Sequence, residues 1–118
     1  MHTRYAEIPA YQTRDGSIIR ELMHPAVHGN GQQSLAEAEV APGETTLRHY
    51  HRRSEELYHV TQGSGWMCLG DARFAIAVGD TVCIAPGVEH CVEATGTVPL
   101  RILCCCSPAY AHEDTVLV

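Results

Sequence analysis

The stretch that determines the fold is GETTLRHYHRRSEELYHVTQG, residues 43–63, which places three histidines and three glutamates between a pair of glycines. Polar and apolar residues alternate along its first half, which predicts a strand with His49 and His51 on one face. Side chains two positions apart in a strand leave the same face, so both imidazoles can reach one point. An isolated pair of this kind is more often a surface or packing feature than a metal site.

A second predicted strand adds a carboxylate to this pair. Residues 56–62 alternate again and place Glu56 and Tyr58 on one side, and His90 follows a proline–glycine turn further along the chain. Three neutral imidazole nitrogens and one carboxylate form a ligand set that suits a divalent transition ion. We therefore expect these side chains to form one candidate site.

The rest of the chain predicts short strands separated by glycine, proline and aspartate. Turn signals recur about every 8 to 12 residues, which favours an all-β sandwich or barrel in one domain. Residues 17–23 fit either a strand or one helical turn, and residues 24–33 are expected to form an exposed loop. Besides residues 56–62, the predicted strands cover residues 36–40, 45–51, 66–69, 74–78, 82–84, 90–94 and 100–106.

Composition excludes several classes of function. The 118 residues carry a net charge of −6, which argues against nucleic-acid or anionic-membrane partners. All eight basic residues are arginine, so lysine-dependent Schiff-base chemistry and phosphate loops are excluded. No apolar run approaches the ~18 residues of a spanning helix, and the N-terminus lacks a signal peptide, so we expect a cytoplasmic protein. The six cysteines are expected to be reduced, small apolar side chains.

Two motifs at the right separation resemble those of the cupin superfamily. The first motif is matched at every fixed position by Gly43, His49, His51, Glu56 and Gly63. The second motif is matched at its opening Gly79 and Asp80 and at Gly87 and His90. Ala85 replaces its usual first proline, and Ala94 replaces its usual asparagine. Neither position is a metal ligand in the family, so these departures bear on local turn and rim geometry and not on metal binding.

The resemblance covers about residues 34–106 and implies a double-stranded β-helix, the cupin jelly-roll barrel. It further implies that residues 1–33 join the barrel as a strand and loop, and that residues 107–118 form a tail that either folds over the rim or is disordered. Small cupins often pair through an edge strand, so a homodimer is expected.

The resemblance also implies one divalent transition ion, Fe, Mn, Ni, Cu or Zn, held inside the barrel mouth. Its ligands would be His49, His51, Glu56 and His90. Glu55 is the competing ligand, but the spacing to Gly63 and the strand parity both select Glu56. Cys91 follows His90 directly and is expected on the opposite face.

A mononuclear dioxygenase acting on a small, oxygen-chelating organic substrate is the leading functional hypothesis. The alternatives are a non-redox metal-dependent isomerase or lyase, and a small-molecule-binding module without catalysis. Tyr58 is a candidate proton donor, with a packing role as its alternative. The interior is expected to be apolar, built from Leu47, Val60 and a choice of Phe74, Ile76, Val82 and Ile84.

Residues at the rim offer further candidates. A substrate carboxylate could bind Arg20, Arg48 or Arg101, although solvated surface is the commoner environment of arginine. If the tail folds over the rim, Tyr110 and His112 could reach the site or a partner subunit.

Overall fold

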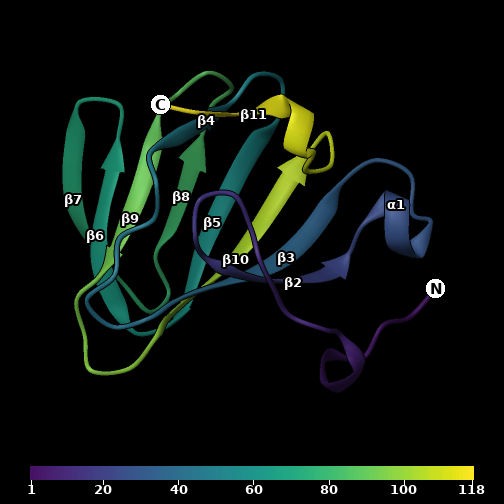
Figure 1. The fold of residues 1–118 in the computed structure, drawn as a ribbon, viewed down its shortest axis with the longest axis horizontal. Coiled ribbons are helices and arrows are strands. Elements are labelled where there is room, and N and C mark those ends of the chain that lie inside the picture. Colours follow the sequence, from purple (N-terminus) through teal and green to yellow (C-terminus); the bar gives the residue numbers. More distant parts are fainter.

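The computed structural model describes residues 1–118 and consists of two antiparallel sheets that enclose one core (Figure 1). The first sheet has the order β1 (Tyr11–Gln12), β2 (Ile18–Met23), β3 (Ser34–Val40), β10 (Leu100–Ser107), β5 (Glu55–Gln62) and β8 (Thr81–Ile84). The second has the order β11 (Thr115–Leu117), β4 (His49–His51), β9 (His90–Ala94), β6 (Ser64–Leu69) and β7 (Ala72–Ala77). The expected all-β, double-stranded β-helix in a single domain is confirmed.

Strand alternation builds the core between the sheets. Along β5 every second residue is buried, so Glu56, Tyr58 and Val60 face inward while their neighbours face outward. Ile76 and Ile84 join Tyr58 and Val60 in one hydrophobic cluster, as the sequence predicts, and the partly buried Phe74 and Val82 pack against it. Strand β5 therefore contributes inward residues that two-residue alternation selects.

The prediction that Leu47 lies in the interior is wrong, because this residue is 55% exposed. The predicted strand over residues 45–51 is interrupted: Thr45 makes an isolated bridge to Glu93, and regular pairing resumes only in β4. Without a continuous ladder, the alternation that places His49 inward does not extend back to Leu47.

The N-terminal segment extends the first sheet rather than lying apart from it. Residues 18–23 form strand β2, one of the two alternatives left open by the sequence, and pair with β3. The expected loop over residues 24–33 contains a short helix, α1 (Pro25–His28), which the His24 side chain caps by accepting from the Ala26 amide. Two 3-10 turns, Tyr5–Glu7 and His112–Asp114, have three residues each. None of these helical segments has the length and apolar character of a membrane-spanning helix.

The C-terminal segment folds back against the barrel beside β4, at the top of Figure 1. Strand β11 pairs with β4 so that Thr115 lies opposite His51. The Asp114 carboxylate accepts from the backbone amides of Arg53 and Ser54 at 2.9 and 3.1 Å. These contacts hold the tail in place over the loop that precedes β5.

All six cysteines are free thiols, but they do not share one environment. Only Cys104 and Cys106 are buried; Cys83 is exposed, and Cys68, Cys91 and Cys105 are partly buried. Packing as small apolar side chains therefore describes two of the six.

Candidate metal centre

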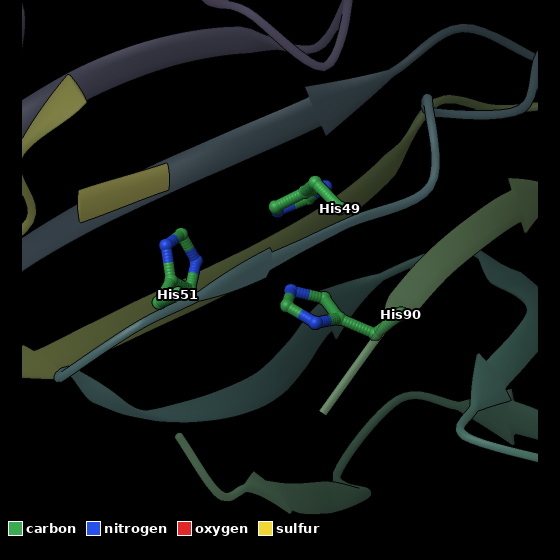
Figure 2. A group of neighbouring side chains, drawn as sticks. All are labelled: His49, His51 and His90. Atoms are coloured by element: carbon green, nitrogen blue, oxygen red, sulfur yellow. The ribbon is translucent and has the colours of Figure 1, made fainter. Parts of the chain in front are cut away.

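Three buried imidazoles come together at the mouth of the barrel. His49 and His51 lie on β4, and His90 lies on the neighbouring strand β9 directly opposite His49. Their side-chain nitrogens lie within 4.8 Å of one another, and the residues are 4%, 3% and 0% exposed. Figure 2 shows the three rings turned toward a common region. The cluster could hold one metal ion.

Hydrogen bonds at Nδ1 orient two of these rings. His49 Nδ1 lies 2.9 Å from the Leu47 carbonyl oxygen, and His90 Nδ1 lies 3.0 Å from the Val88 carbonyl oxygen. A carbonyl oxygen only accepts hydrogen bonds, so each Nδ1 carries the hydrogen and each Nε2 keeps a free lone pair. The neutral tautomer that metal coordination through Nε2 requires is thus set by the backbone.

His51 is oriented by the C-terminal strand instead. Its Nδ1 lies 3.0 Å from the Thr115 hydroxyl, and that hydroxyl donates to the Ala111 carbonyl oxygen, also at 3.0 Å. Because the hydroxyl hydrogen is used, Thr115 accepts from His51 Nδ1. All three Nε2 atoms therefore remain available as ligand atoms.

Glu56 brings a carboxylate to the same place, while Glu55 is exposed on the other side of β5. Glu56 Oε1 lies 3.1 Å from His51 Nε2 and 3.5 Å from His90 Nε2. The Cys106 thiol donates to Oε2 at 3.2 Å. Burial works to raise the pKa of Glu56, but the adjacent His51 and His90 rings outweigh burial and hold this pKa at about 2.

The arrangement fits a bound cation. A carboxylate oxygen facing imidazole lone pairs is repulsive unless a proton or a metal ion lies between them. His90 Nε2 is buried and has no hydrogen-bond partner, which buried polar atoms rarely tolerate. Burial and the proximity of His90 lower the pKa of His49, which favours the neutral, ligating form of that ring. The donor set does not specify which ion binds.

A cavity of about 50 Å³ adjoins the imidazoles, with room for a few water molecules or a small ligand. Tyr58 lines it, is 7% exposed, and places its ring 5.8 Å from the His90 ring. Burial and the Glu56 charge raise the pKa of Tyr58 well above its ordinary value. Tyr58 therefore keeps its proton at neutral pH and both packs and faces the cavity.

The tail contributes one of its two candidate residues to the cavity. Tyr110 lines it and places its ring 5.8 Å from the His51 ring. Its hydroxyl lies 3.0 Å from His112 Nδ1 and 3.4 Å from the Thr13 hydroxyl. His112 contacts the site only through Tyr110.

The three arginines considered at the rim all pair with glutamates and do not line the cavity. Arg20 lies 3.6 Å from Glu37, Arg48 lies 3.5 Å from Glu89, and Arg101 lies 2.9 Å from Glu39. Of the two roles left open for these arginines, the structure therefore favours the surface environment over binding of a substrate carboxylate. In the predicted strands, the alternation of side chains already places these arginines on the outer face, away from the cavity.

Sequence reasoning missed Asp15, Cys106 and Thr115. Asp15 Oδ2 lies 4.0 Å from His49 Nδ1, and Cys106 and Thr115 bond to Glu56 and His51. Cys106 could have been found by pairing β10 with β5, because that register places it opposite Glu56. No local pattern indicates the other two.

Residues 36–106 match the Cupin_2 family, described as a cupin domain. Together with the two-sheet barrel and the imidazole cluster at its mouth, this match shows that the chain belongs to the cupin family, as a small single-domain member.

Two relatives align over most of the chain. An uncharacterized protein of Methanocaldococcus jannaschii, MJ1618, is 49% identical over 98% of this chain and 93% of its own length. Protein SchB of Streptomyces halstedii is 30% identical over 93% of this chain and 79% of its own length.

Three solved structures have the same fold at low sequence identity. A predicted oxalate decarboxylase from Thermotoga maritima superposes with a TM-score of 0.80 at 22% identity, covering 92% of this chain and 99% of that one. The nucleoside dehydratase Pac13 of Streptomyces gives 0.82 at 14% identity, covering 100% and 90%. The polyketide cyclase RemF of Streptomyces resistomycificus gives 0.79 at 21%, covering 97% and 88%.

Proposed function

We propose that this cupin is a metal-dependent enzyme whose divalent transition ion is held by His49, His51, His90 and Glu56. The observation that supports the proposal is the convergence of three Nε2 atoms whose rings are each held through Nδ1. The unpartnered, fully buried Nε2 of His90 adds to it. With one carboxylate among three neutral rings, a dication keeps a net charge near +1.

Non-redox chemistry on a small oxygen-bearing substrate, of isomerase or lyase type, fits the site best. A bound divalent ion supplies Lewis-acid polarisation of a substrate oxygen. Decarboxylation, dehydration and cyclisation, the activities in the names of the similar structures, all gain from charge stabilisation at oxygen.

Two thiols lie in the cavity wall beside the proposed ligands. Cys104 and Cys106 both line the cavity, and Cys106 contacts Glu56 directly. Burial and the Glu56 charge raise the pKa of both thiols, so they stay protonated and do not compete with the imidazoles as thiolate ligands.

The chain's own residues would position the substrate and control its protons. Tyr58 keeps its proton, so it donates a hydrogen bond to a substrate oxygen and does not serve as a base. Ile19, Ala36 and Ala38 form an apolar part of the wall that limits water around the reacting atoms.

A dioxygenase is the second candidate. Four protein ligands leave up to two positions of an octahedral ion free, enough for a chelating substrate or for dioxygen. This hypothesis stays a prediction of the sequence.

Metal analysis followed by product analysis separates the two candidates. Protein purified without added ions is expected to retain about one divalent transition ion per chain. Diketones, catechols and flavonoid-like compounds are then incubated with it in air and under nitrogen. Turnover that is equal in both atmospheres supports the non-redox proposal, whereas turnover that consumes dioxygen contradicts it.

Replacing Glu56 by glutamine tests the ligand set. Glu56→Gln removes the anionic ligand, so we expect metal retention and turnover to fall together, by roughly ten-fold or more. Glu55→Gln is the matched control, because the neighbouring glutamate is exposed. Retained metal and activity in Glu56→Gln would show that the carboxylate ligand is wrongly assigned.

A further inference from the structure

Glu21 is a charged side chain at an inward-facing position of the barrel wall. Strand β2 pairs with β3 so that Glu21 lies opposite Ala36 and Ile19 lies opposite Ala38. These residues all line the cavity beside the imidazoles, so Glu21 interrupts an otherwise apolar part of the wall. A carboxylate at such a position needs hydrogen-bond donors.

Only one oxygen of Glu21 has a donor. The Tyr11 hydroxyl donates to Oε1 at 2.9 Å, while Oε2 is buried and has no partner. Asp15 faces the same cavity, but its Oδ1 already accepts from the backbone amide and the hydroxyl of Ser17. Glu21 Oε2 is thus a buried acceptor that a ligand with an N–H or O–H group would satisfy.

Glu21 also stands at the junction of two cavities. An outer cavity of about 340 Å³ lies beside the inner one and shares Tyr11, Glu21 and Tyr110 with it. A substrate whose reacting end lies at the imidazoles therefore presents its other end to Glu21.

Positive side chains that would receive an anionic group are missing from both walls. Neither cavity is lined by arginine, and the chain contains no lysine. His24 and His112 line the outer cavity, but both His24 nitrogens are used, one by the Ala26 amide and the other by the Tyr110 carbonyl oxygen. His112 is held through Nδ1 by the Tyr110 hydroxyl.

We propose that Glu21 is a specificity-determining residue that accepts a hydrogen bond from the substrate, and that the substrate carries an ammonium or hydroxyl group there. Carboxylate and phosphate groups are disfavoured at this end because they would face the Glu21 carboxylate with no cation nearby. The inference rests on the proposed function, which places the reacting end of the substrate at the imidazoles.

Three catechols that differ in one substituent test this directly. Each chelates a metal through adjacent hydroxyls and carries an aminomethyl, a methyl or a carboxylate group at the far side of the ring. Their dissociation constants are measured by calorimetry on the zinc-loaded protein under nitrogen, and again on the metal-free protein. For the wild type we expect the aminomethyl probe to bind tightest and the carboxylate probe weakest.

The Glu21→Gln variant isolates the contribution of the charge. It should lose about ten-fold in affinity for the aminomethyl probe and leave the methyl probe within about two-fold. Glu55→Gln removes a charge from the outer face of the same sheet and should change none of the three constants. Tyr11→Phe keeps the Glu21 charge and should keep the preference for the positively charged aminomethyl probe.

Each outcome addresses one claim. A carboxylate probe that binds the wild type as tightly as the aminomethyl probe would overturn the substrate class. An unchanged preference in Glu21→Gln would overturn the role of Glu21. Failure of the wild type to bind zinc would count against the proposed function alone, because the ranking on the metal-free protein still tests Glu21.

Discussion

At the scale of single residues, the tautomer of His51 depends on one hydroxyl from the far end of the chain. Thr115 accepts from His51 Nδ1 and passes its own hydrogen to the Ala111 carbonyl oxygen. Hydrogen bonds of this kind fix the ring of a ligating histidine and raise its basicity. The C-terminal strand is therefore part of the candidate metal centre, although it contributes no ligand.

Replacing Thr115 by valine keeps the shape of the side chain and removes the acceptor. We expect Thr115→Val to weaken metal affinity by roughly 10- to 100-fold, measured by competition with a chelator. Thr115→Ser keeps the hydroxyl and should bind nearly as the wild type does. Equal metal affinities of the Thr115→Val variant and the wild type would show that the Thr115 side chain only packs.

Cys106 plays the corresponding part for Glu56, since its thiol donates to Oε2. Cys106→Ala should lower metal affinity by roughly three- to ten-fold, and Cys106→Ser should restore much of it with a hydroxyl donor. Cys104→Ala is the control, because the Cys104 thiol contacts the Ile102 carbonyl oxygen instead. A loss in the control as large as in Cys106→Ala would indicate a packing effect.

At the scale of elements, strand parity explains what the sequence could predict. His49, His51 and His90 come together, and Glu56 faces inward while Glu55 faces out, because two-residue alternation holds within each strand. Leu47 fails the same rule because pairing is interrupted before β4.

Contacts between distant segments are what alternation does not encode. The hydrogen bond from His51 to Thr115 joins residues 64 positions apart, and that from Cys106 to Glu56 joins residues 50 positions apart. Both depend on how the strands pair across the closed barrel, which no local pattern specifies.

Gly65 on β6 lies so close to the neighbouring strand β9 that a side chain at this position would collide with its backbone. A Cβ at Gly65 would lie 2.3 Å from the backbone oxygen of Glu93 on β9, so a strand would have to move. Gly65→Ala should lower the free energy of unfolding by about 1–3 kcal/mol, measured by urea denaturation. Gly31→Ala, where no atom lies within 4 Å, should be close to neutral. A neutral Gly65→Ala would mean that β6 and β9 are not held this closely.

At the scale of the whole molecule, the fold brings ligands from both sheets to one opening. His49, His51 and His90 come from the five-stranded sheet and Glu56 from the six-stranded sheet, so the centre forms only when the two sheets close on each other. The N-terminal strand β2 and the C-terminal tail complete the walls with Glu21 and Tyr110. The expected homodimer stays a prediction, which sedimentation equilibrium measures.

The most direct measurement is a crystal structure of protein loaded with a transition ion, with anomalous data collected at its absorption edge. We predict one anomalous peak per chain, bonded to the Nε2 atoms of His49, His51 and His90 at about 2.0–2.2 Å and to a carboxylate oxygen of Glu56. Rings that point apart, or a peak located elsewhere on the chain, would contradict the account.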